Sequence, residues 1–283
     1  MKITIHSKTD VGKIRDHNED SFLATIGNGN VKDDILIMVA DGMGGHAAGE
    51  IASGMATKHI GEKFKDGTIF KGQKDIGESL KNLVEAVNKA VWDAGRGNDK
   101  QGMGTTCTVA VIRQETLFYA HVGDSRAYIL RNDQLTQVTK DHSWVAEAVE
   151  RGEISEEEAR LHPQRNVITR AVGLDANVSI DVGFEKLHKG DLVLLCSDGL
   201  NSMISDIEIK RLLLTSEPRQ ICEKLIDRAN SAGGRDNTTV VVAVMGAGTS
   251  RLNKETQPIK TTQYVKKPSG FLRKIVRRIF LKK

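Results

Sequence analysis

The chain has 283 residues, of which 39% are hydrophobic and 28% are charged. This length supports one large domain with a substantial core, and the composition is typical of a globular protein rather than a disordered or fibrous one. No run of 18 apolar residues occurs and the N-terminus has no apolar stretch, so we expect neither a membrane-spanning helix nor a secretory signal peptide. Cys107, Cys196 and Cys222 lack metal-ligand spacing and predict reduced thiols in a cytoplasmic protein.

The net charge of +4 is the sum of two regions of opposite sign. Residues 251–283 hold 11 of the 41 Lys and Arg residues but one of the 37 acidic residues, so the rest of the chain carries a net charge of −6. An acidic body and a basic tail indicate two physically different parts. We therefore predict a domain at 1–246, a flexible linker at 247–268 and a basic amphipathic helix at 269–283.

Strand-like and helix-like segments alternate along the domain. Strands are predicted at 2–8, 21–26, 35–40, 105–113, 116–122, 126–131 and 193–197, and a further apolar run covers 240–244. Helices are predicted at 49–64, 76–94, 208–214 and 218–232. Short strands with tight turns favour antiparallel pairing, and helices in pairs favour layers that cover the sheets.

Two connections need separate interpretation. Gly123-Asp124-Ser125 is a turn between two strand-like segments, which predicts a hairpin. Residues 143–166 are polar and acid-rich, and they predict two short helices in an excursion between strands. Long excursions beside a functional site are often lids or recognition elements.

Three carboxylates lie at the ends of apolar runs. They are Asp41 in Asp41-Gly42 after 35–40, Asp198 in Asp198-Gly199 after 192–197, and Asp236 shortly before 240–244. A single Asp-Gly pair is typical of a solvent-exposed turn, but a carboxylate at the tip of a buried strand is costly unless something pairs with it. Converging tips would suit hard cations such as Mg²⁺ or Mn²⁺, which prefer oxygen ligands.

A charged segment upstream could supply the cationic group of the same site. It reads Arg15-Asp16-His17-Asn18-Glu19-Asp20 and on its own would be a charged loop. Two divalent ions can activate water and neutralise part of the charge on a phosphate ester. Arg15 is suited to bind the phosphoryl group itself, because its guanidinium matches phosphate in a bidentate manner.

Six motifs occur in one order over about residues 5–245. They are Arg15-x-x-Asn18-Glu19-Asp20, Asp41-Gly42-Met43-Gly44-Gly45-His46, Met103-Gly104-Thr105-Thr106, Val122-Gly123-Asp124-Ser125-Arg126, Ser197-Asp198-Gly199-Leu200 and Arg235-Asp236-Asn237-Thr238-Thr239. The set closely resembles the metal-dependent protein serine/threonine phosphatases (the protein phosphatase 2C-like, or PPM, family), and in particular the bacterial branch. The resemblance implies an α+β fold, a four-layer α-β-β-α sandwich of two antiparallel sheets flanked by helices, with a dimetal site at one end.

The implied activity is hydrolysis of phosphoserine and phosphothreonine in proteins by direct attack of metal-bound water, without a phosphoenzyme. The resemblance implies two Mn²⁺ or Mg²⁺ ions bridged by Asp41. The Gly42 carbonyl would ligate one ion, while Asp198 and Asp236 would ligate the other.

Further roles follow from the same resemblance. Arg15 would bind the substrate phosphate, Glu19 and Asp20 would hold metal-bound waters, and Asp124 resembles a residue that helps to bind a third, weaker ion. The excursion at 143–166, with the segment 168–173 that follows, resembles a mobile flap that shapes substrate access.

The general acid departs from the pattern of many eukaryotic members, which carry a His directly after the first Asp-Gly. Met43 stands there in this chain. His46 could donate a proton instead, although a structural role near a helix start is the alternative, and water could protonate the leaving oxygen.

Other functions compete with this interpretation. Cys107-x5-Arg113 has the spacing of thiol-based phosphatases, but the five residues between them favour a strand, which would separate the two ends by roughly 20 Å. A catalytically dead scaffold should have lost a metal ligand, and none is lost. Small phosphoesters are a third alternative, against which the flap argues.

The C-terminal segment 271–283 alternates apolar and basic pairs, which would give a helix one apolar and one cationic face. We predict contact with an anionic membrane surface at the inner face, with docking on the body or on a partner as the alternative. Nucleic acid would not require the apolar face, so we expect no nucleic-acid partner. The expected partners are phosphoproteins, a Ser/Thr kinase and its targets, and the enzyme is expected to act as a monomer in the cytoplasm.

Overall fold

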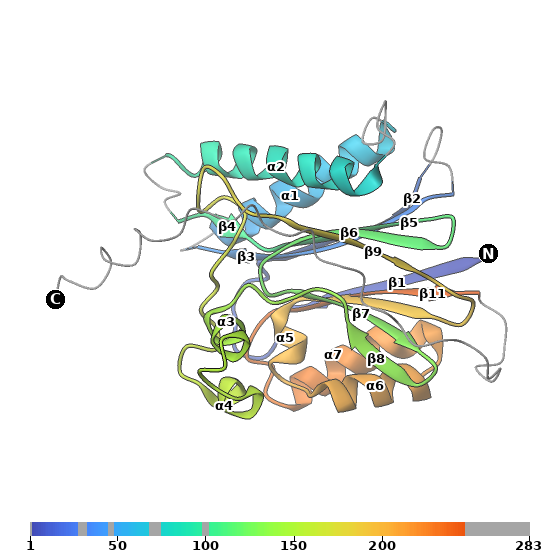
Figure 1. Cartoon of the computed structure of the whole chain (residues 1–283). Helices are drawn as coiled ribbons and strands as arrows, with labels where there is room; N and C mark the ends of the chain where they lie inside the picture. Colours follow the sequence, from blue (N-terminus) through green and yellow to red (C-terminus); the bar gives the residue numbers. More distant parts are fainter. Residues whose placement is uncertain (1, 28–32, 45–47, 68–74, 98–101, 247–283) are drawn as a thin grey trace.

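The structure, a computed structural model, describes residues 2–27, 33–44, 48–67, 75–97 and 102–246. Two antiparallel sheets face each other, and helices cover the outer face of each sheet (Figure 1). The predicted linker and basic helix lie outside the described residues. In the described part of the chain, no helix has both the length and the apolar character needed to cross a membrane.

The first sheet is built mainly from strands of the N-terminal half of the domain. Its strands, in spatial order, are β2 (Asp20–Ile26), β3 (Ile35–Met43), β5 (Cys107–Arg113), β6 (Thr116–Val122) and β9 (Asp181–Lys186), and the short β4 (Gly104–Thr105) pairs with the end of β3. Helices α1 (Ala48–Lys65) and α2 (Ile76–Ala94) cover it. Helix α2 begins where the Asp75 carboxylate accepts the Gly77 and Glu78 N–H groups, an N-cap that satisfies donors without helical partners.

The second sheet joins the two ends of the described chain. Its strands, in spatial order, are β1 (Ile3–Asp10), β11 (Thr238–Met245), β10 (Leu192–Cys196), β7 (Arg126–Arg131) and β8 (Gln134–Gln137). The helices on its outer face are α5 (Asp198–Asn201), α6 (Asp206–Thr215) and α7 (Ile221–Ser231), the last preceded by a 3₁₀ turn at Pro218–Gln220.

The four-layer arrangement explains why several strands are apolar without alternation. In β3, Leu36 and Met38 pack in the cluster under α1 and α2, while Ile37 and Val39 pack in the cluster between the sheets. A strand buried on both faces needs apolar residues at every position. The continuous apolar runs that predicted buried strands therefore reflect two cores, one on each side.

The predicted hairpin at Gly123–Ser125 is wrong. Strand β6 pairs with β5 and β9, whereas β7 pairs with β10 and β8, so the turn carries the chain from one sheet to the facing sheet. A tight turn fixes the reversal of the chain but not whether the next strand pairs with the last one or faces it. Here both strands already have a neighbour on each edge, which leaves no edge for the hairpin pairing.

Most other predicted elements are confirmed with small shifts at their ends. Helix α2 has the predicted bounds, and the excursion contains the two short helices α3 (Trp144–Glu150) and α4 (Glu156–Leu161). The predicted strand 105–113 is divided between β4 and β5. Strands β8 and β9 and helix α5 were not predicted, because each is short and has a mixed polar pattern.

Candidate functional site

Segments from both sheets bring the predicted acidic residues together. Asp20, the first residue of β2, lies opposite Asp41 of β3 in the strand register. Asp124 is in the turn between β6 and β7, and Asp198 opens α5 directly after β10. Asp236 lies in the turn before β11. Each of these carboxylates thus projects from a strand end or an adjoining turn, as the sequence predicted.

The electrostatics of the cluster reflect the proximity of its members. Burial, followed by the charges of Asp20, Asp198, Asp124 and Asp236, raises the pKa of Asp41 well above its ordinary value. Burial and nearby carboxylates raise the pKa of Asp20 to about 7 and that of Asp198 to about 6. Such a set of buried like charges is unfavourable unless protons or cations compensate it.

Two oxygens in this cluster have no partner. Asp20 Oδ1 and Asp124 Oδ1 are buried and accept no hydrogen bond within the described structure. Across the described ranges, no three Asp, Glu, His or Cys side chains are gathered into a ready-made metal cage. The fit to hard cations comes instead from the charge of the cluster and from its unpaired carboxylate oxygens, because hard cations prefer oxygen ligands.

Both Asp-Gly pairs need glycine because another backbone segment packs against them. A Cβ on Gly42 would lie 2.2 Å from the Gly49 carbonyl oxygen and 2.6 Å from that of Glu19. A Cβ on Gly199 would lie 1.9 Å from the Asn237 carbonyl oxygen. The absent side chain therefore lets the segments that carry Glu19 and Asn237 approach the two aspartates closely.

Arg15 and Glu19 lie beside the cluster. Arg15 Nη2 donates to Asp236 Oδ2 at 2.8 Å, and half of the Arg15 side chain remains exposed. Gly42 N–H donates to the Glu19 carbonyl at 3.1 Å, which ties this segment to the first Asp-Gly pair. Burial raises the pKa of the Glu19 carboxyl. The structure thus places a guanidinium with further donors available next to a group of acidic residues.

Three polar residues that support the carboxylates were inside the predicted motifs but had no assigned role. Ser197 donates to Asp20 Oδ2 at 2.7 Å. Asn237 Oδ1 accepts the Glu19 N–H at 2.8 Å, and Thr106 Oγ1 accepts the Asp41 N–H at 2.8 Å. Each of these bonds joins residues more than 60 positions apart, so their only signal in the sequence was adjacency to a motif.

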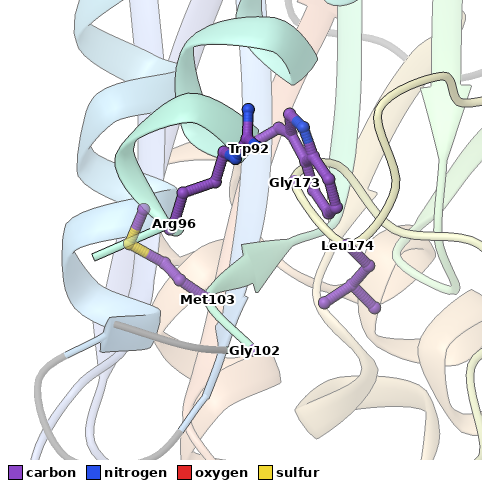
Figure 2. Close-up of a pocket in the computed structure, with 7 residues that line it drawn as sticks. Trp92, Arg96, Gly102, Met103, Gly173 and Leu174 are labelled. Atoms are coloured by element: carbon purple, nitrogen blue, oxygen red, sulfur yellow. The ribbon is translucent and has the colours of Figure 1, made fainter. Parts of the chain in front are cut away.

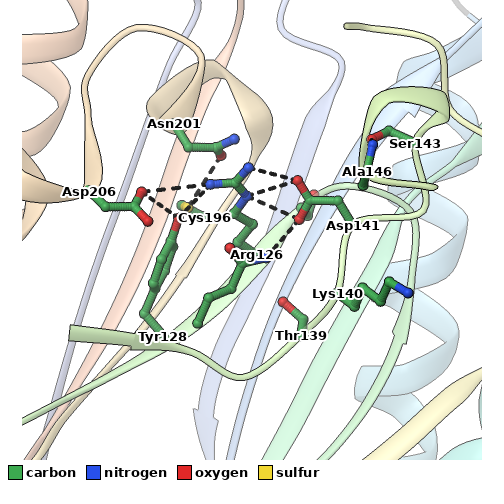
Figure 3. Close-up of polar contacts among 12 residues, drawn as sticks. Arg126, Tyr128, Thr139, Lys140, Asp141, Ser143, Ala146, Cys196, Asn201 and Asp206 are labelled. Atoms are coloured by element: carbon green, nitrogen blue, oxygen red, sulfur yellow. Dashed lines mark hydrogen bonds and ion pairs between the residues drawn. The ribbon is translucent and has the colours of Figure 1, made fainter. Parts of the chain in front are cut away.

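A partly buried arginine holds the strand after Asp124 to the segment before the flap (Figure 3). Arg126 Nε donates to both Asp141 carboxylate oxygens at 3.0 Å, and its Nη2 donates to Oδ2 at 2.7 Å. Arg126 Nη1 donates to the Tyr128 hydroxyl at 2.9 Å, and that hydroxyl donates to Asp206 Oδ1 at 3.1 Å. This bidentate pair fixes the chain one residue before His142.

His142 then ties the base of the flap to the turn that carries Asp124. The backbone N–H of His142 donates to the Gly123 carbonyl at 2.7 Å, and the Gly123 N–H donates to the ring nitrogen Nδ1 of His142 at 3.1 Å. His142 Nε2 lies 3.2 Å from Asp181 Oδ2 and 3.0 Å from Arg170 Nη1. Ser143 caps α3 and forms a bridge with Ile168, which closes the excursion at its base.

A cavity of about 290 Å³ lies where the C-terminal end of α2 meets the segments around Met103 and Gly173 (Figure 2). It is lined by Trp92, Gly95, Arg96, Gly102, Met103, Gly173 and Leu174. None of these residues belongs to the carboxylate cluster, although Met103 directly precedes β4, the strand that pairs with Gly42 and Met43. Met43 ends β3, and His46 lies outside the described residues, so its role as a proton donor stays a prediction.

The thiol alternative fails on geometry, as predicted, and also on charge. Cys107 and Arg113 occupy opposite ends of the single strand β5, and the Arg113 guanidinium is bound to Asp34. Burial raises the pKa of the Cys107 thiol to about 12, so the nucleophilic thiolate does not form near neutral pH. All three cysteines are free and buried.

Two facing antiparallel sheets between helix layers, with a carboxylate cluster built from strand ends and turns, define the class of α-β-β-α sandwich phosphatases. The sequence model of the family described as protein phosphatase 2C matches residues 14–237. The chain therefore belongs to the protein phosphatase 2C family, and it is an enzyme of the hydrolase class, as its motifs predicted.

Known relatives agree with this assignment. The chain is 41% identical to the serine/threonine phosphatase stp of Listeria monocytogenes over 243 residues, which cover 83% of this chain and 93% of the relative. The structure of a Streptococcus agalactiae serine/threonine phosphatase is similar with a TM-score of 0.80 at 36% identity, covering 86% of this chain and all of that one. The catalytic domain of the serine/threonine phosphatase PstP, solved with two manganese ions, has a TM-score of 0.74 at 36% identity, covering 86% and 97%.

Proposed function

We propose that the chain hydrolyses phosphoserine and phosphothreonine in proteins with the help of two Mn²⁺ or Mg²⁺ ions held by the carboxylate cluster. The observation that carries this proposal is the mutual elevation of the pKa values of buried carboxylates, two of which keep an unpaired oxygen. Bound cations would offset the repulsion between the carboxylates and would provide a partner for the two unpaired oxygens.

The ligand assignment follows the position of each group. Asp41, whose pKa responds to all four other carboxylates, is suited to bridge two ions, with the Gly42 carbonyl as a further ligand. Asp198 and Asp236 would ligate the second ion, and Asp20 and Glu19 would hold metal-bound water. Asp124, raised in pKa by burial and by Asp198, would help to bind a third ion. When bound, the ions would supply charge neutralisation and activate water for direct attack on phosphorus.

Arg15 has the geometry of a phosphate-binding residue. Its Nη2 is engaged by Asp236, and the remaining donors of the guanidinium face an exposed region next to the cluster. A guanidinium binds two oxygens of a phosphoryl group at once, which would orient the phosphorus toward the cluster. The carboxylate of Asp236 keeps this side chain in place before substrate binds.

A phosphoprotein is favoured over a small phosphoester by the flap, whose two helices and connecting turns are a large structure for a small substrate. None of the five aspartates of the cluster is replaced in the sequence, which argues against a catalytically dead scaffold. By analogy with the named relatives, the enzyme would reverse the action of a Ser/Thr kinase. We expect it to work as a cytoplasmic monomer.

The test is hydrolysis of a phosphothreonine peptide and of a small aryl phosphate by the purified full-length protein, with Mn²⁺, with Mg²⁺ and with EDTA. Metal-dependent hydrolysis of the peptide that disappears in Asp41→Asn supports the proposal. Faster turnover of the small ester than of the peptide, compared by kcat/KM, would favour the small-substrate alternative. A folded wild-type protein without activity under any metal would restore the scaffold alternative.

The composition of the tail supports a second proposal, association with an anionic membrane surface. Six basic residues and an apolar set recur with helical spacing between 271 and 283. Basic residues close to an anionic leaflet add on the order of 1 kcal/mol each, and apolar side chains add burial in the interface. The tail would concentrate the phosphatase near membrane-bound phosphoproteins at the inner face.

A further inference from the structure

Strand β3 changes its partner where it carries Asp41. It pairs with β5 up to Val39 opposite Thr108, and with β4 from Gly42 opposite Thr105. Both ladders have the same register, so Asp41 faces Thr106 across the interruption. The break therefore comes from a local change in hydrogen bonding and not from an inserted residue.

A side-chain hydroxyl replaces a backbone carbonyl at this point. At a hydrogen-bonded position of an antiparallel pair, the two facing residues exchange two backbone N–H···O=C bonds. Thr106 N–H donates to the Asp41 carbonyl at 2.8 Å, but the Asp41 N–H donates to Thr106 Oγ1, also at 2.8 Å. The Thr105 hydroxyl, which has a single proton to donate, lies 2.9 Å from the Thr106 carbonyl oxygen and 3.0 Å from the Asp41 carbonyl oxygen. The backbone N–H of Asp41 thus depends on one hydroxyl.

The same hydroxyl reaches the turn that carries Asp124. Thr106 Oγ1 lies 2.8 Å from Ser125 Oγ, and both residues are fully buried. The methyl group of Thr106 packs on Gly123, where a Cβ would come within 2.6 Å of it. Gly123 has a φ of +112°, a conformation that favours glycine. Thr106 therefore contacts the residues on both sides of Asp124.

We propose that Thr106 is a positioning residue whose hydroxyl sets Asp41 and Asp124 at a fixed separation and so prepares the cluster for cations. The inference rests on the proposed metal-dependent activity and extends it to a residue outside the ligand set. Asp41 and Asp124 come from different connections of the fold, and within the described residues Thr106 is bonded both to Asp41 and to a residue adjoining Asp124. Without this hydroxyl, the Asp41 N–H has no acceptor unless the ladder closes onto the Thr106 carbonyl, which would move the carboxylate.

The decisive variant is Thr106→Val, which keeps the shape of the side chain and removes the hydroxyl. We expect the dissociation constant of Mn²⁺, measured by calorimetry without substrate, to rise by about 10–100-fold, the usual range for groups that orient metal ligands. We expect kcat on a phosphothreonine peptide to fall while KM for the peptide changes little. Thr106→Ser retains the hydroxyl and should recover most of the Mn²⁺ affinity.

Thr139→Val provides a matched control. Thr139 is 5% exposed, and its Oγ1 accepts the Ala127 N–H at 2.9 Å, the same kind of buried bond but one that involves neither Asp41 nor a residue adjoining Asp124. Both valine variants should lose similar thermal stability, and only Thr106→Val should lose Mn²⁺ affinity. An equal loss of affinity in the two variants, or none in either, would overturn the proposal.

Ser125→Ala separates the two halves of the inference and replaces Thr106→Val if that variant does not fold. Ser125→Ala keeps the hydrogen bond from the Asp41 N–H to Thr106 Oγ1 and removes the contact between Thr106 Oγ1 and Ser125 Oγ. We therefore expect loss of the weakest Mn²⁺-binding step, which is the one assigned to the third ion near Asp124. Unchanged Mn²⁺ binding in Ser125→Ala would overturn the link to Asp124. Failure of the wild-type protein to bind Mn²⁺ would instead overturn the proposed function itself, whatever the variants do.

Discussion

Ser197 donates its hydroxyl proton to Asp20 Oδ2 at 2.7 Å, although 177 residues separate the two. Asp20 begins β2 of one sheet, and Ser197 directly follows β10 of the other. The Ser197 oxygen in turn accepts the Thr239 N–H at 2.9 Å, so its single proton is left for Asp20. This bond holds one carboxylate oxygen, and the other, Oδ1, is the buried atom without a partner. The hydroxyl therefore fixes the direction of the open oxygen.

Replacing Ser197 by Ala should weaken metal binding more than folding. Asp20 would lose its orienting bond, and Thr239 N–H would lose an acceptor at the price of about 1–3 kcal/mol of stability. We expect the Mn²⁺ concentration for half-maximal activity to rise by about 10–100-fold. A titration of activity with Mn²⁺, next to a thermal melt of the metal-free protein, checks both effects. An unchanged titration would show that Asp20 does not depend on Ser197.

Asp41→Asn should have opposite effects on the metal-free and metal-bound protein. It removes a negative charge from a buried cluster in which carboxylates oppose one another, so the metal-free protein should gain on the order of 1 kcal/mol of stability. Excess Mn²⁺ at about 100 times its Kd would stabilise the wild type by about 2.7 kcal/mol, and the variant should lose most of this gain. Melting curves with EDTA and with Mn²⁺ measure both. A destabilised metal-free variant would contradict the view of Asp41 as a repelled charge.

Arg15→Ala should raise KM more than it lowers kcat if the guanidinium mainly binds ground-state phosphate. A charge-assisted hydrogen bond contributes about 1.5–3 kcal/mol, which corresponds to a rise in KM of about 10–100-fold. Arg15→Lys keeps the charge without the bidentate geometry and should recover only part of the loss. Steady-state kinetics on a phosphothreonine peptide separate the two constants. A fall confined to kcat would assign Arg15 to the transition state instead.

His121 should make the free energy of unfolding depend on pH below about 6.5. Burial and the nearby His142 lower the pKa of His121 to about 4, against the opposing charges of Asp141 and Asp181. Its ring lies between the Thr108 hydroxyl at 2.9 Å and the Lys140 carbonyl at 3.0 Å, where the neutral form satisfies both. As the pH falls from 6.5 to 4, His121 binds a proton in the unfolded chain but not in the folded chain, so the free energy of unfolding decreases.

The expected loss from His121 is about 3 kcal/mol, and it levels off below pH 4. Other titrating groups cancel when the free energy of unfolding of the wild type is compared with that of His121→Gln at each pH. The difference should be constant above pH 7 and should shift in favour of the variant on acidification. A difference independent of pH would show that His121 titrates alike in the folded and unfolded states.

The tail should decide membrane association. Full-length protein should float with vesicles that contain anionic lipid and not with neutral vesicles, and a truncation to residues 1–250 should float with neither. Added salt should weaken the binding, because part of it is electrostatic. Equal flotation of the two proteins would reject a membrane role. A difference in activity between them without vesicles would favour docking of the tail on the body.

Chemistry that depends on neighbouring residues could be predicted from the sequence. The strands around Asp41 and Asp198 were found because burial on both faces demands an unbroken apolar run, and this demand acts on each position independently. The predicted set of site residues came from the order of the motifs, and the structure brings its five aspartates near one another. The α+β sandwich also followed, since alternating elements with short connections have few ways to bury both cores.

Only the tertiary structure decided which distant segments meet. The turn at Gly123–Ser125 crosses between sheets because β6 and β7 already have neighbours on both edges, a fact about strands β9, β10 and β8 that no local pattern contains. The roles of Thr106 and Ser197 likewise depend on partners 65 and 177 positions away. The sequence by itself determined which residues carry charge and which are buried. The fold determined which hydroxyl orients which carboxylate, because a hydrogen bond requires contact and contact between distant residues arises only when the sheets pack.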